Sequence, residues 1–413
     1  MITKSLLYII NFYGSPPLNY FEKYIKETKS AHITILKLPS VRTSKFRLII
    51  DAFIKDEQDK RHNFHLNVLL PLPYFVLFIL QYAINAILAL YLLRKIKRKK
   101  FDIGIGETNF GSAVCYILRK LRVLKFSVYF NGDILPDPSS SPKCFFLPNP
   151  TRFHFICKFI DTIFLKLQER LRKLGYLNDA VWYGNETIKK WDEKRGFKSK
   201  SHFVADPILI DFNEYIKYKK TKKNKDMICY IGRIDEYVGL DVIISSLLLV
   251  KKKIPTINLQ VVGGSGIILE KYKKLVEKLN LSKNVTFYGF LPKMEDAFSI
   301  MSKCALGVAL YKPTPDNVSM FSQPAKPKEY IKVGLPVLVT KNGPPIGKEI
   351  VSYRAGLDSL YDQNDASRAI VKALTDDKYY LSLQKGVEDY AKKNHYFNTI
   401  KKVWQKIISY EIR

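Results

Sequence analysis

Two cationic side chains and one carboxylate occur where a phosphate-bearing ligand could contact them. Gly232 and Arg233 directly follow a predicted strand at 227–231, so the guanidinium can offer two parallel donors to a phosphate. The segment SQPAKPKEY adds the ammonium of Lys326 and, at a predicted helix start, the carboxylate of Glu329. Arg233 alone fits a surface ion pair equally well. Together the side chains suit a diphosphate and the diol of a ribose.

Glycine-rich turns follow two further predicted strands of the same half. The sequence GGSG at 263–266, with Gly264 in second position, lies between a strand and a helix, where backbone N–H groups can approach an anion. A turn that only reverses the chain fits it as well, because the spacing of a dinucleotide-binding motif is incomplete. Gly289, Phe290 and Leu291 follow the next strand and are expected at the same edge of the sheet.

The elements that must position these residues alternate between strand and helix patterns. The predicted strands are 6–11, 32–38, 102–106 and 126–130 in the first half, and 227–231, 258–262, 285–288, 304–310 and 336–340 in the second. This alternation indicates an α/β fold with two Rossmann-like, doubly wound parallel-sheet domains facing a central cleft. Ligands of such sheets bind outside the carboxyl ends of the strands. Gly14 follows the first strand, and Asn131 and Asp133 follow the fourth.

The composition fits a folded and strongly basic protein. The 413 residues are 47% hydrophobic, and 68 basic against 38 acidic residues give a formal charge of +30. No helix-turn-helix spacing or RNA-binding aromatic pattern accompanies this charge, so no nucleic-acid partner is predicted. Attraction to an anionic membrane surface explains the charge with fewer assumptions. The five cysteines form no CxxC pair and no metal-ligand cluster occurs, so neither disulfides nor a metal site are predicted.

A hydrophobic segment at 68–93 interrupts the first half. Its residues 74–93 contain no charged side chain and would form a helix ~30 Å long, the thickness of a bilayer core. The basic run RKIKRKK follows at 94–100. A transmembrane helix would place half of one sheet across the membrane, so we predict a helix that lies in the membrane interface beside the amino-terminal domain. A long helix buried in the core is the alternative.

A set of motifs in the second half resembles a known family. The motifs are YIGRI, VVGGSG, VTFYGFLP, SxPxKxxEY with GLPVLVT, and a closing EIV, in this order across residues 228–351. As a set they are similar to glycosyltransferase family 4, whose enzymes have the two-domain GT-B fold. The resemblance implies retaining transfer of a sugar from a nucleotide-sugar donor, a UDP- or GDP-sugar, without a metal or another cofactor. The first half resembles the family mainly in its strand order.

The resemblance also implies roles for individual residues. Arg233 and Lys326 would neutralise charge that develops on the leaving diphosphate, which is electrostatic stabilisation of the transition state. Glu329 would accept hydrogen bonds from the ribose hydroxyls, and the backbone at 289–291 would hold the base. Gly14 would let the diphosphate or the acceptor approach closely. The expected donor-binding set also contains Gly232, Gly264, Phe290, Leu291, Ser322 and Tyr330.

Three positions depart from the family pattern. Val238 stands where the family often has a lysine, and Lys326 can substitute for that phosphate cation. Phe321 stands at the first glutamate of the usual paired-glutamate motif, which the subgroup with SxPxKxxEY typically lacks. Asn131 stands where a histidine is often found, so Asn131 or Asp133 is expected near the anomeric carbon of the sugar.

The predicted function is that of a retaining glycosyltransferase at the cytoplasmic face of a membrane. Its partners would be the nucleotide sugar, a lipid-linked or other glycan acceptor, and the anionic membrane surface. A nucleotide-sugar epimerase with the same fold is one alternative. A membrane-associated scaffold without activity is another, for which Val238 and Asn131 are the motivating positions.

Domain boundaries follow from the same patterns. Residues 1–212 would bind the acceptor, and residues 227–395 would bind the nucleotide sugar. Between them, the lysine-rich residues 213–226 are predicted to form a solvated linker. A helix at 396–413 is expected to pack back across the domain junction.

Overall fold

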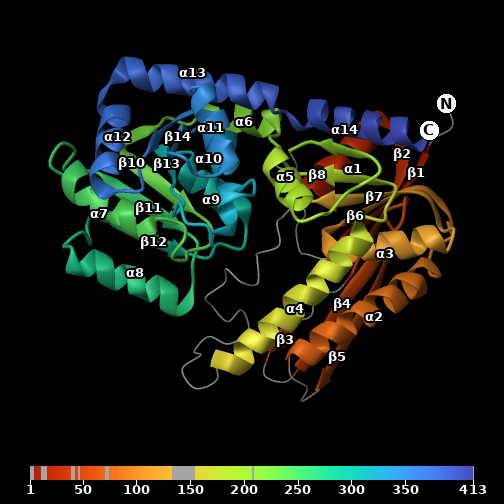
Figure 1. The fold of residues 1–413 in the computed structure, drawn as a ribbon. Coiled ribbons are helices and arrows are strands. Elements are labelled where there is room, and N and C mark those ends of the chain that lie inside the picture. Colours follow the sequence, from red (N-terminus) through yellow and green to blue (C-terminus); the bar gives the residue numbers. More distant parts are fainter. Residues whose placement is uncertain are drawn as a thin grey trace. The chain divides into compact units, whose positions relative to one another are not determined.

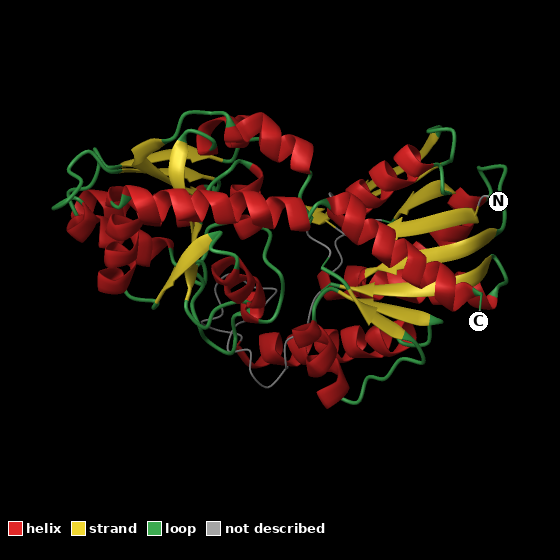
Figure 2. Ribbon diagram, turned by 90° about the horizontal axis from the view of Figure 1, so that it is seen from above, coloured by secondary structure: helices red, strands yellow, loops and turns green. Residues whose placement is uncertain are grey.

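The computed structural model describes residues 4–10, 16–38, 42–44, 47–69, 74–132, 154–206 and 209–412. The chain forms two compact units, each built around its own sheet (Figure 1). Unit 1 contains Met1–Pro207 together with Thr399–Arg413, and unit 2 contains Ile208–Asn398. Figure 2 shows helices packed along the sheet of each unit. The prediction of two doubly wound α/β domains is confirmed.

The sheet of unit 1 combines a parallel part with an antiparallel extension. Its strands are β1 (Lys4–Ile10), β2 (Ala31–Lys37), β3 (Arg42–Ser44), β4 (Arg47–Lys55), β5 (Arg61–Leu69), β6 (Phe101–Glu107), β7 (Leu124–Asn131), β8 (Ala180–Tyr183) and β9 (His202–Val204). The order is β3-β4-β2-β1-β6-β7-β8-β9, with β5 paired to β4. Strands β3, β4 and β5 run antiparallel to their neighbours. The sequence analysis did not predict this hairpin, although Ile50, Ala52 and Ile54 alternate as buried residues along β4.

Helices cover the sheet of unit 1. They are α1 (Pro16–Thr28), α2 (Tyr74–Leu93), α3 (Thr108–Lys120), α4 (His154–Gly175), α5 (Glu186–Lys194) and α14 (Tyr396–Glu411), which belongs to unit 1 from Thr399 onward. Within this unit the ring of Trp404 lies 6.1 Å from that of Phe21. The ammonium of Lys4 lies 2.8 Å from the carboxylate of Glu411, so both ends of the chain are tied to one sheet.

The hydrophobic segment forms α2, and the carboxy-terminal half of this helix packs against β4 and the core of unit 1. Leu88, Ala89 and Leu92 are buried in a cluster with residues of β1, β2 and β4. The buried-core alternative therefore holds for this face of the helix. On another face Ile87 is 66% exposed, and Leu90 is exposed as well. In the part of the chain that the structure describes, no helix is both long enough and apolar enough to cross a membrane.

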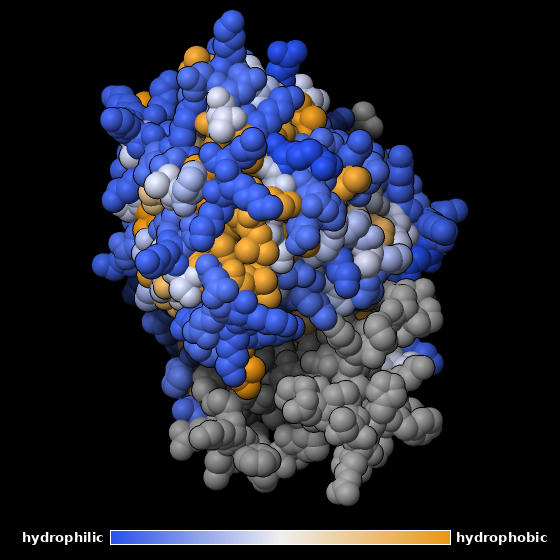
Figure 3. All heavy atoms as spheres, turned by 90° about the vertical axis from the view of Figure 1, so that its left-hand side faces the viewer, coloured by the Kyte–Doolittle hydropathy of each residue, from blue (hydrophilic) through white to orange (hydrophobic). Residues whose placement is uncertain are grey.

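Unit 2 has a fully parallel sheet, ordered β12-β11-β10-β13-β14-β15. Its strands are β10 (Asn224–Ile231), β11 (Asn258–Val262), β12 (Val285–Gly289), β13 (Cys304–Ala309), β14 (Val337–Thr340) and β15 (Gly356–Ser359). Its helices are α6 (Phe212–Lys219), α7 (Leu240–Val250), α8 (Gly266–Lys278), α9 (Met294–Met301), η1 (Val318–Met320), α10 (Lys326–Lys332), α11 (Pro345–Ser352), α12 (Gln363–Thr375) and α13 (Asp377–Lys393). The side of this unit that carries α7, α8 and α12 is mostly hydrophilic, with one compact apolar patch (Figure 3).

The lysine-rich segment 213–226, interpreted as a solvated linker, is folded instead. It contains most of α6 and the first residues of β10. Tyr215 is buried in the core of unit 2, which explains why a segment so rich in lysine forms a packed helix. Lys223 donates to the carbonyl oxygens of Ser302 and Val333 at 2.8 and 2.7 Å, and burial lowers its pKa to about 8.

Candidate active site

The candidate site lies where the strand order of unit 2 reverses. Strands β10 and β13 are neighbours in the sheet, but their successors β11 and β14 lie on opposite sides. In open parallel sheets, ligands bind outside the carboxyl ends of the strands at this switch point. Gly232 and Arg233 follow β10 at this edge, and Leu310 and Tyr311 follow β13. The two strands thus direct the predicted phosphate cation to the expected position.

Glycines allow the turns after β10 and β11 to touch. A Cβ on Gly263 would lie 2.2 Å from the carbonyl oxygen of Gly232, so no larger residue fits there. Both residues also have positive φ, 105° at Gly232 and 116° at Gly263, which favours glycine. The amide of Gly263 donates to the carbonyl of Gly289 at 2.7 Å, so the turn after β11 also reaches the end of β12. Three of the predicted glycine turns therefore meet at one edge of the sheet.

Lys326, the first residue of α10, reaches this edge with its side chain. Its Nζ donates to the hydroxyl of Tyr230 at 2.6 Å and to the carbonyl of Arg233 at 3.2 Å. The same atom lies 4.4 Å from the ring centre of Tyr230 and 5.7 Å from that of Tyr311. Burial lowers the pKa of Lys326 to about 7; Asp235 opposes this shift and Arg233 reinforces it. No carboxylate is hydrogen-bonded to this ammonium among the contacts of the described residues.

Arg233 lies next to Lys326 but extends into solvent. Its side chain is 85% exposed, and its Nη2 forms an ion pair of 2.9 Å with Asp235. The structure therefore brings the ammonium of Lys326 against the loop that carries Arg233. Because exposed ion pairs contribute little, the guanidinium can exchange Asp235 for a ligand at small cost.

Glu329 lies in the first turn of α10, three residues after Lys326. Its Oε1 accepts from Lys332 Nζ at 2.9 Å, so the carboxylate is engaged on its own helix. Ser322 lies half-buried in the segment between η1 and α10. Ser322 and Glu329 thus come from the loop and helix that position Lys326, as the sequence predicted. Among the described contacts, neither residue contacts Arg233.

Tyr330 is fully buried and has a positioning role. Its hydroxyl accepts from the amide of Ile231 at 2.9 Å and donates to the carbonyl of Val308 at 2.9 Å. The ring lies against Gly307, where a Cβ would be 2.2 Å from the ring. Tyr330 therefore joins β10 to β13 beneath the site. It was predicted to bind the donor, but its hydroxyl is already satisfied within the protein.

An aromatic side chain marks the carboxyl end of β12. Phe290 is 73% exposed, whereas Leu291 is half-buried against the core. Gly289 ends the strand with φ of 67°, and Gly264 has φ of 74° in the neighbouring turn. A large exposed aromatic next to open backbone suits the stacking of a planar ligand. Base binding at 289–291 stays a prediction.

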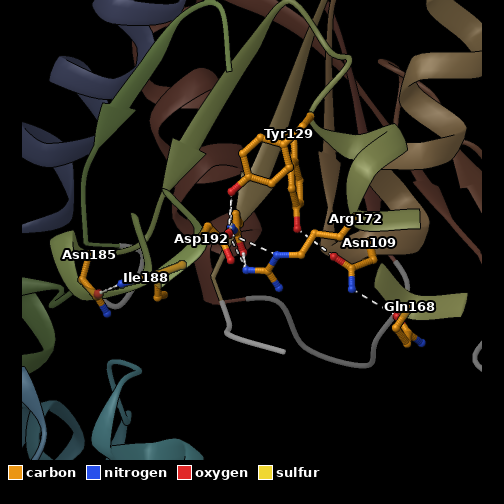
Figure 4. A network of polar contacts seen from close by, with 9 residues as sticks. Asn109, Tyr129, Gln168, Arg172, Asn185, Ile188 and Asp192 are labelled. Carbon is orange, nitrogen blue, oxygen red and sulfur yellow. Dashed lines mark hydrogen bonds and ion pairs between the residues drawn. The ribbon is translucent and has the colours of Figure 1, made fainter. Parts of the chain in front are cut away.

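The predicted residue of unit 1 that the structure describes, Asn131, is buried at the end of β7. It lies beside the ion pair of Arg172 and Asp192, which Figure 4 labels. Its Nδ2 donates to Asp192 Oδ2 at 2.7 Å, and its Oδ1 accepts from Arg172 Nη2 at 3.1 Å. Arg172 and Asp192 form an ion pair of 2.6 Å, and the hydroxyl of Tyr176 also donates to Asp192. The amide of Asn131 is thus used inside unit 1.

Gly14 and Asp133, also predicted for the site in unit 1, lie outside the described residues.

Several residues of the site were not found from the sequence. Tyr230 and Tyr311 lie against the ammonium of Lys326, and Asp235 raises its pKa. A tyrosine near a strand end and an acid in a loop carry no specific signal. Val238 is buried in the core of unit 2, so no cation replaces the expected lysine at that position. Over the described ranges, no three His, Cys, Asp or Glu side chains gather as a metal site would require.

Comparisons with solved structures identify the fold. HepE from Anabaena, solved with UDP and glucose, aligns with a TM-score of 0.61 at 13% identity over 98% of this chain and 99% of its own. Sucrose-phosphate synthase from Thermosynechococcus elongatus aligns with a TM-score of 0.65 at 14% identity over 98% and 99%. WaaG, a glycosyltransferase involved in lipopolysaccharide biosynthesis, gives 0.55 at 13% identity over 96% and 98%. These similarities show the two-domain GT-B fold.

The sequence comparison is confined to unit 2. No match is found among curated proteins. A family model described as "Glycosyl transferases group 1" matches residues 211–393, which contain Arg233, Lys326 and every turn that meets at the site. Residues 211–393 are therefore similar to the glycosyl transferases group 1 family, and the prediction of a nucleotide-sugar glycosyltransferase is confirmed at this level.

Proposed function

We propose that this chain transfers a sugar from a UDP- or GDP-sugar to a lipid-linked or other glycan acceptor, with retention at the anomeric carbon and without a metal. The observation that carries the proposal is the convergence of Lys326 Nζ and Arg233 at the switch point of unit 2, where Nζ lies 3.2 Å from the Arg233 carbonyl. The finer assignment to glycosyltransferase family 4 belongs to the proposal and rests on the motif order across residues 228–351.

The chemistry assigned to these residues is charge stabilisation. As the bond between the sugar and the diphosphate breaks, negative charge grows on the leaving phosphate oxygens. Lys326 and Arg233 bind these oxygens, and their hydrogen bonds strengthen as the charge develops. The backbone at Gly232 and Gly264 lets the diphosphate approach the strand ends. Glu329 accepts from the ribose hydroxyls after it separates from Lys332.

The solved neighbours support a nucleotide-sugar donor. HepE was solved with UDP and glucose, and sucrose-phosphate synthase is named for a product that contains a transferred sugar. In this chain, Phe290 and the backbone of Gly289 are assigned to the base. We propose that unit 1 binds the acceptor and that Asp133 serves the reaction there, because the amide of Asn131 is engaged with Arg172 and Asp192.

Membrane association is part of the proposal because apolar and basic side chains adjoin on unit 1. Ile87, Leu90 and Tyr91 are exposed on α2, and Leu66 is exposed on β5. The ring of Tyr91 lies 6.0 Å from that of Phe64 in β5, so the two elements meet there. The basic run 94–100 follows directly. Apolar insertion beside cations is the pattern of peripheral binding to the anionic cytoplasmic face of a membrane.

The donor assignment is tested by acceptor-dependent release of nucleoside diphosphate from a panel of UDP- and GDP-sugars. Arg233→Ala should abolish release, whereas Lys274→Ala, which removes a cation from the exposed face of α8, should not. The anomeric configuration of the product, read by NMR, tests retention. Conversion of the donor without an acceptor would favour the epimerase. Binding without turnover for every acceptor would favour the scaffold, whose motivating observation is the buried Val238.

The membrane assignment is tested by sedimentation with vesicles of phosphatidylglycerol and phosphatidylcholine. The double variant Ile87→Gln, Leu90→Gln should lose binding to these vesicles. Leu381→Gln, at an exposed leucine of unit 2, is the matched control and should bind like the wild type. Equal sedimentation of all three proteins would overturn the membrane assignment and leave the donor assignment intact.

A further inference from the structure

A second concave site lies in unit 2 beside β15, and it shares no residue with the candidate donor site. The groove has a volume of about 660 Å³ and is lined by β15, by α12 and α13, and by the turn that follows α11. This volume lies within the range of ~300–1,000 Å³ that is typical of small-molecule sites. Strand β15 ends the sheet and pairs only with β14, so its other edge borders the groove.

Cations and carboxylates share this groove. Arg368 and Asp365 are already paired, because Arg368 Nη2 lies 2.7 Å from Asp365 Oδ1, and the other oxygen of this carboxylate accepts from the amide of Leu360 at 2.6 Å. Two further cations, Arg354 and Lys372, also line the groove.

Arg354 and Lys372 form no ion pair with a carboxylate of the described part of the chain. The ammonium of Lys372 lies 4.4 Å over the ring centre of Tyr379. The guanidinium of Arg354 has no hydrogen bond or ion pair among the described contacts. Both cations therefore retain their capacity to bind an anion.

The backbone fixes Arg354 at the groove. Its φ of 55° is left-handed, a conformation that glycine usually occupies after the end of a helix. Its amide donates to the carbonyl of Val351 at 2.9 Å, which closes the turn after α11. Helix α13 presses on this turn, since a Cβ on Gly386 would lie 2.3 Å from the carbonyl carbon of Arg354. The side chain therefore starts from a rigid point rather than from a mobile loop.

Hydroxyl and carboxylate groups complete the lining. Tyr379 and Ser382 come from α13, and Asp358 comes from β15. Burial raises the pKa of the Tyr379 hydroxyl, Asp358 raises it further and Arg354 lowers it, so both charged groups act on this hydroxyl. Cations bind phosphate oxygens, whereas carboxylates and hydroxyls bind sugar hydroxyls.

We propose that this groove binds a phosphorylated sugar, with its phosphate at Arg354 and Lys372 and its hydroxyls at Asp358, Tyr379 and Ser382. The volume exceeds that of a phosphate ion alone, and two unpaired cations match one phosphate group. The mixed lining distinguishes this groove from a uniformly basic patch, which would select polyanions. The site is independent of the proposed transferase activity.

The proposal is tested by calorimetric titration of the full chain with glucose 6-phosphate, and in parallel with inorganic phosphate and with glucose. Wild type should bind glucose 6-phosphate. Arg354→Gln and Lys372→Gln should each weaken this binding about tenfold or more, the loss expected for a charge-assisted contact. Lys274→Gln removes the same charge from α8 and should bind like the wild type.

Two outcomes would overturn the proposal. One is binding that survives Arg354→Gln and Lys372→Gln but is lost in Arg233→Ala, which would place the ligand at the donor site. The other is inorganic phosphate that binds as tightly as glucose 6-phosphate, which would remove the sugar from the assignment. Hydrogen exchange of the wild type needs no variant. Added glucose 6-phosphate should slow exchange in peptides within 353–383. Protection confined to peptides around 230–234 would contradict the proposal.

Discussion

In each unit of this protein a helix brings a cation to the carboxyl end of a strand, buried Arg172 to β7 and half-buried Lys326 to β10, but the two cations have opposite surroundings. In unit 1, Arg172 is bonded to the carboxylate of Asp192 at 2.6 Å and to the amide of Asn131. In unit 2, Lys326 is bonded only to a phenol and a carbonyl in the described contacts. The first cluster, around Arg172, pairs its cation with an anion of the protein. The second cluster, around Lys326, has no hydrogen-bonded anion among the described contacts.

The pKa shifts of the two cations express this difference. Burial alone would lower the pKa of Arg172, but the acidic groups of Tyr129, Asp192 and Tyr176 outweigh it and raise the pKa. Burial lowers the pKa of Lys326 to about 7, and Asp235 offsets it only in part. A site whose cation is destabilised until an anion arrives is typical of a binding site rather than of a structural ion pair. The comparison therefore separates a cation that supports the fold from one that serves the ligand.

The largest expected effect is on turnover when the unpaired cation is removed. Lys326→Met should lower kcat/KM for the donor by about a hundredfold to a thousandfold, the loss typical of one transition-state donor. The free energy of unfolding should stay the same or rise, because an apolar side chain replaces an amine whose charged form is disfavoured by burial. Initial rates and urea unfolding measure the two quantities. Lys274→Met is the matched control, and a fall in stability equal to that of a core variant would assign Lys326 to the fold instead.

For Arg172, the cation that is paired within the protein, we expect a loss of stability and little change in donor binding. Arg172→Met should lower the free energy of unfolding by about 3–5 kcal/mol, because it leaves the carboxylate of Asp192 buried without a cation. Donor binding, measured by calorimetry at a temperature where the variant is folded, should stay within about twofold of wild type, a difference below ~0.5 kcal/mol. Arg170→Met, one exposed arginine earlier on α4, controls for charge. An Arg172 variant that is stable but does not bind donor would contradict the assignment of Arg172 to the fold and of Lys326 to ligand binding.

The sequence predicted the second cluster better than the first. Arg233 and Lys326 lie far apart in the chain, yet Arg233 follows β10 and Lys326 comes at the end of the segment that follows β13. Neighbouring strands of one parallel sheet end at a common edge. Strand order and loop position were therefore enough to bring them together. The same reasoning identified the glycine turns at Gly232 and Gly263, where a larger residue would clash.

The first cluster could not be predicted in this way. Arg172 and Asp192 lie on two helices, and their pairing depends on how these helices dock on β7, which no motif encodes. Asn131 was expected near the anomeric carbon because it stands where the family often has a histidine, but its amide turns toward Arg172 and Asp192. Composition misled in a similar way at 213–226, where the apolar contacts of Tyr215 outweigh a run of lysines.

A smaller effect is expected from the phenol that holds Lys326. The anionic donor binds the protonated lysine, so donor affinity should fall as the pH rises through the Lys326 pKa of about 7. The Tyr230 hydroxyl accepts from the ammonium at 2.6 Å and so stabilises the charged form. Tyr230→Phe should move the midpoint of this fall to lower pH and weaken donor binding about tenfold near neutral pH. The measurement is donor affinity across pH for both proteins. A loss of affinity with an unchanged midpoint would mean that Tyr230 acts only through packing.

The smallest expected effect concerns the carboxylate that competes with the donor for Arg233. The ion pair between Arg233 Nη2 and Asp235 at 2.9 Å must open when a diphosphate binds. Asp235→Asn should therefore tighten donor binding about two- to fivefold, the scale of an exposed ion pair, when measured near pH 6, where Lys326 is protonated. Asp235 also supports the charge of Lys326, so the gain should vanish near pH 8, about one pH unit above the Lys326 midpoint. Asp296→Asn, at an exposed acid of α9, should change neither value. Weaker donor binding of Asp235→Asn near pH 6 would show instead that Asp235 orients Arg233 toward the ligand. The ion pair of Arg233 and Asp235 would then be a structural pair, like that of Arg172 and Asp192 in unit 1.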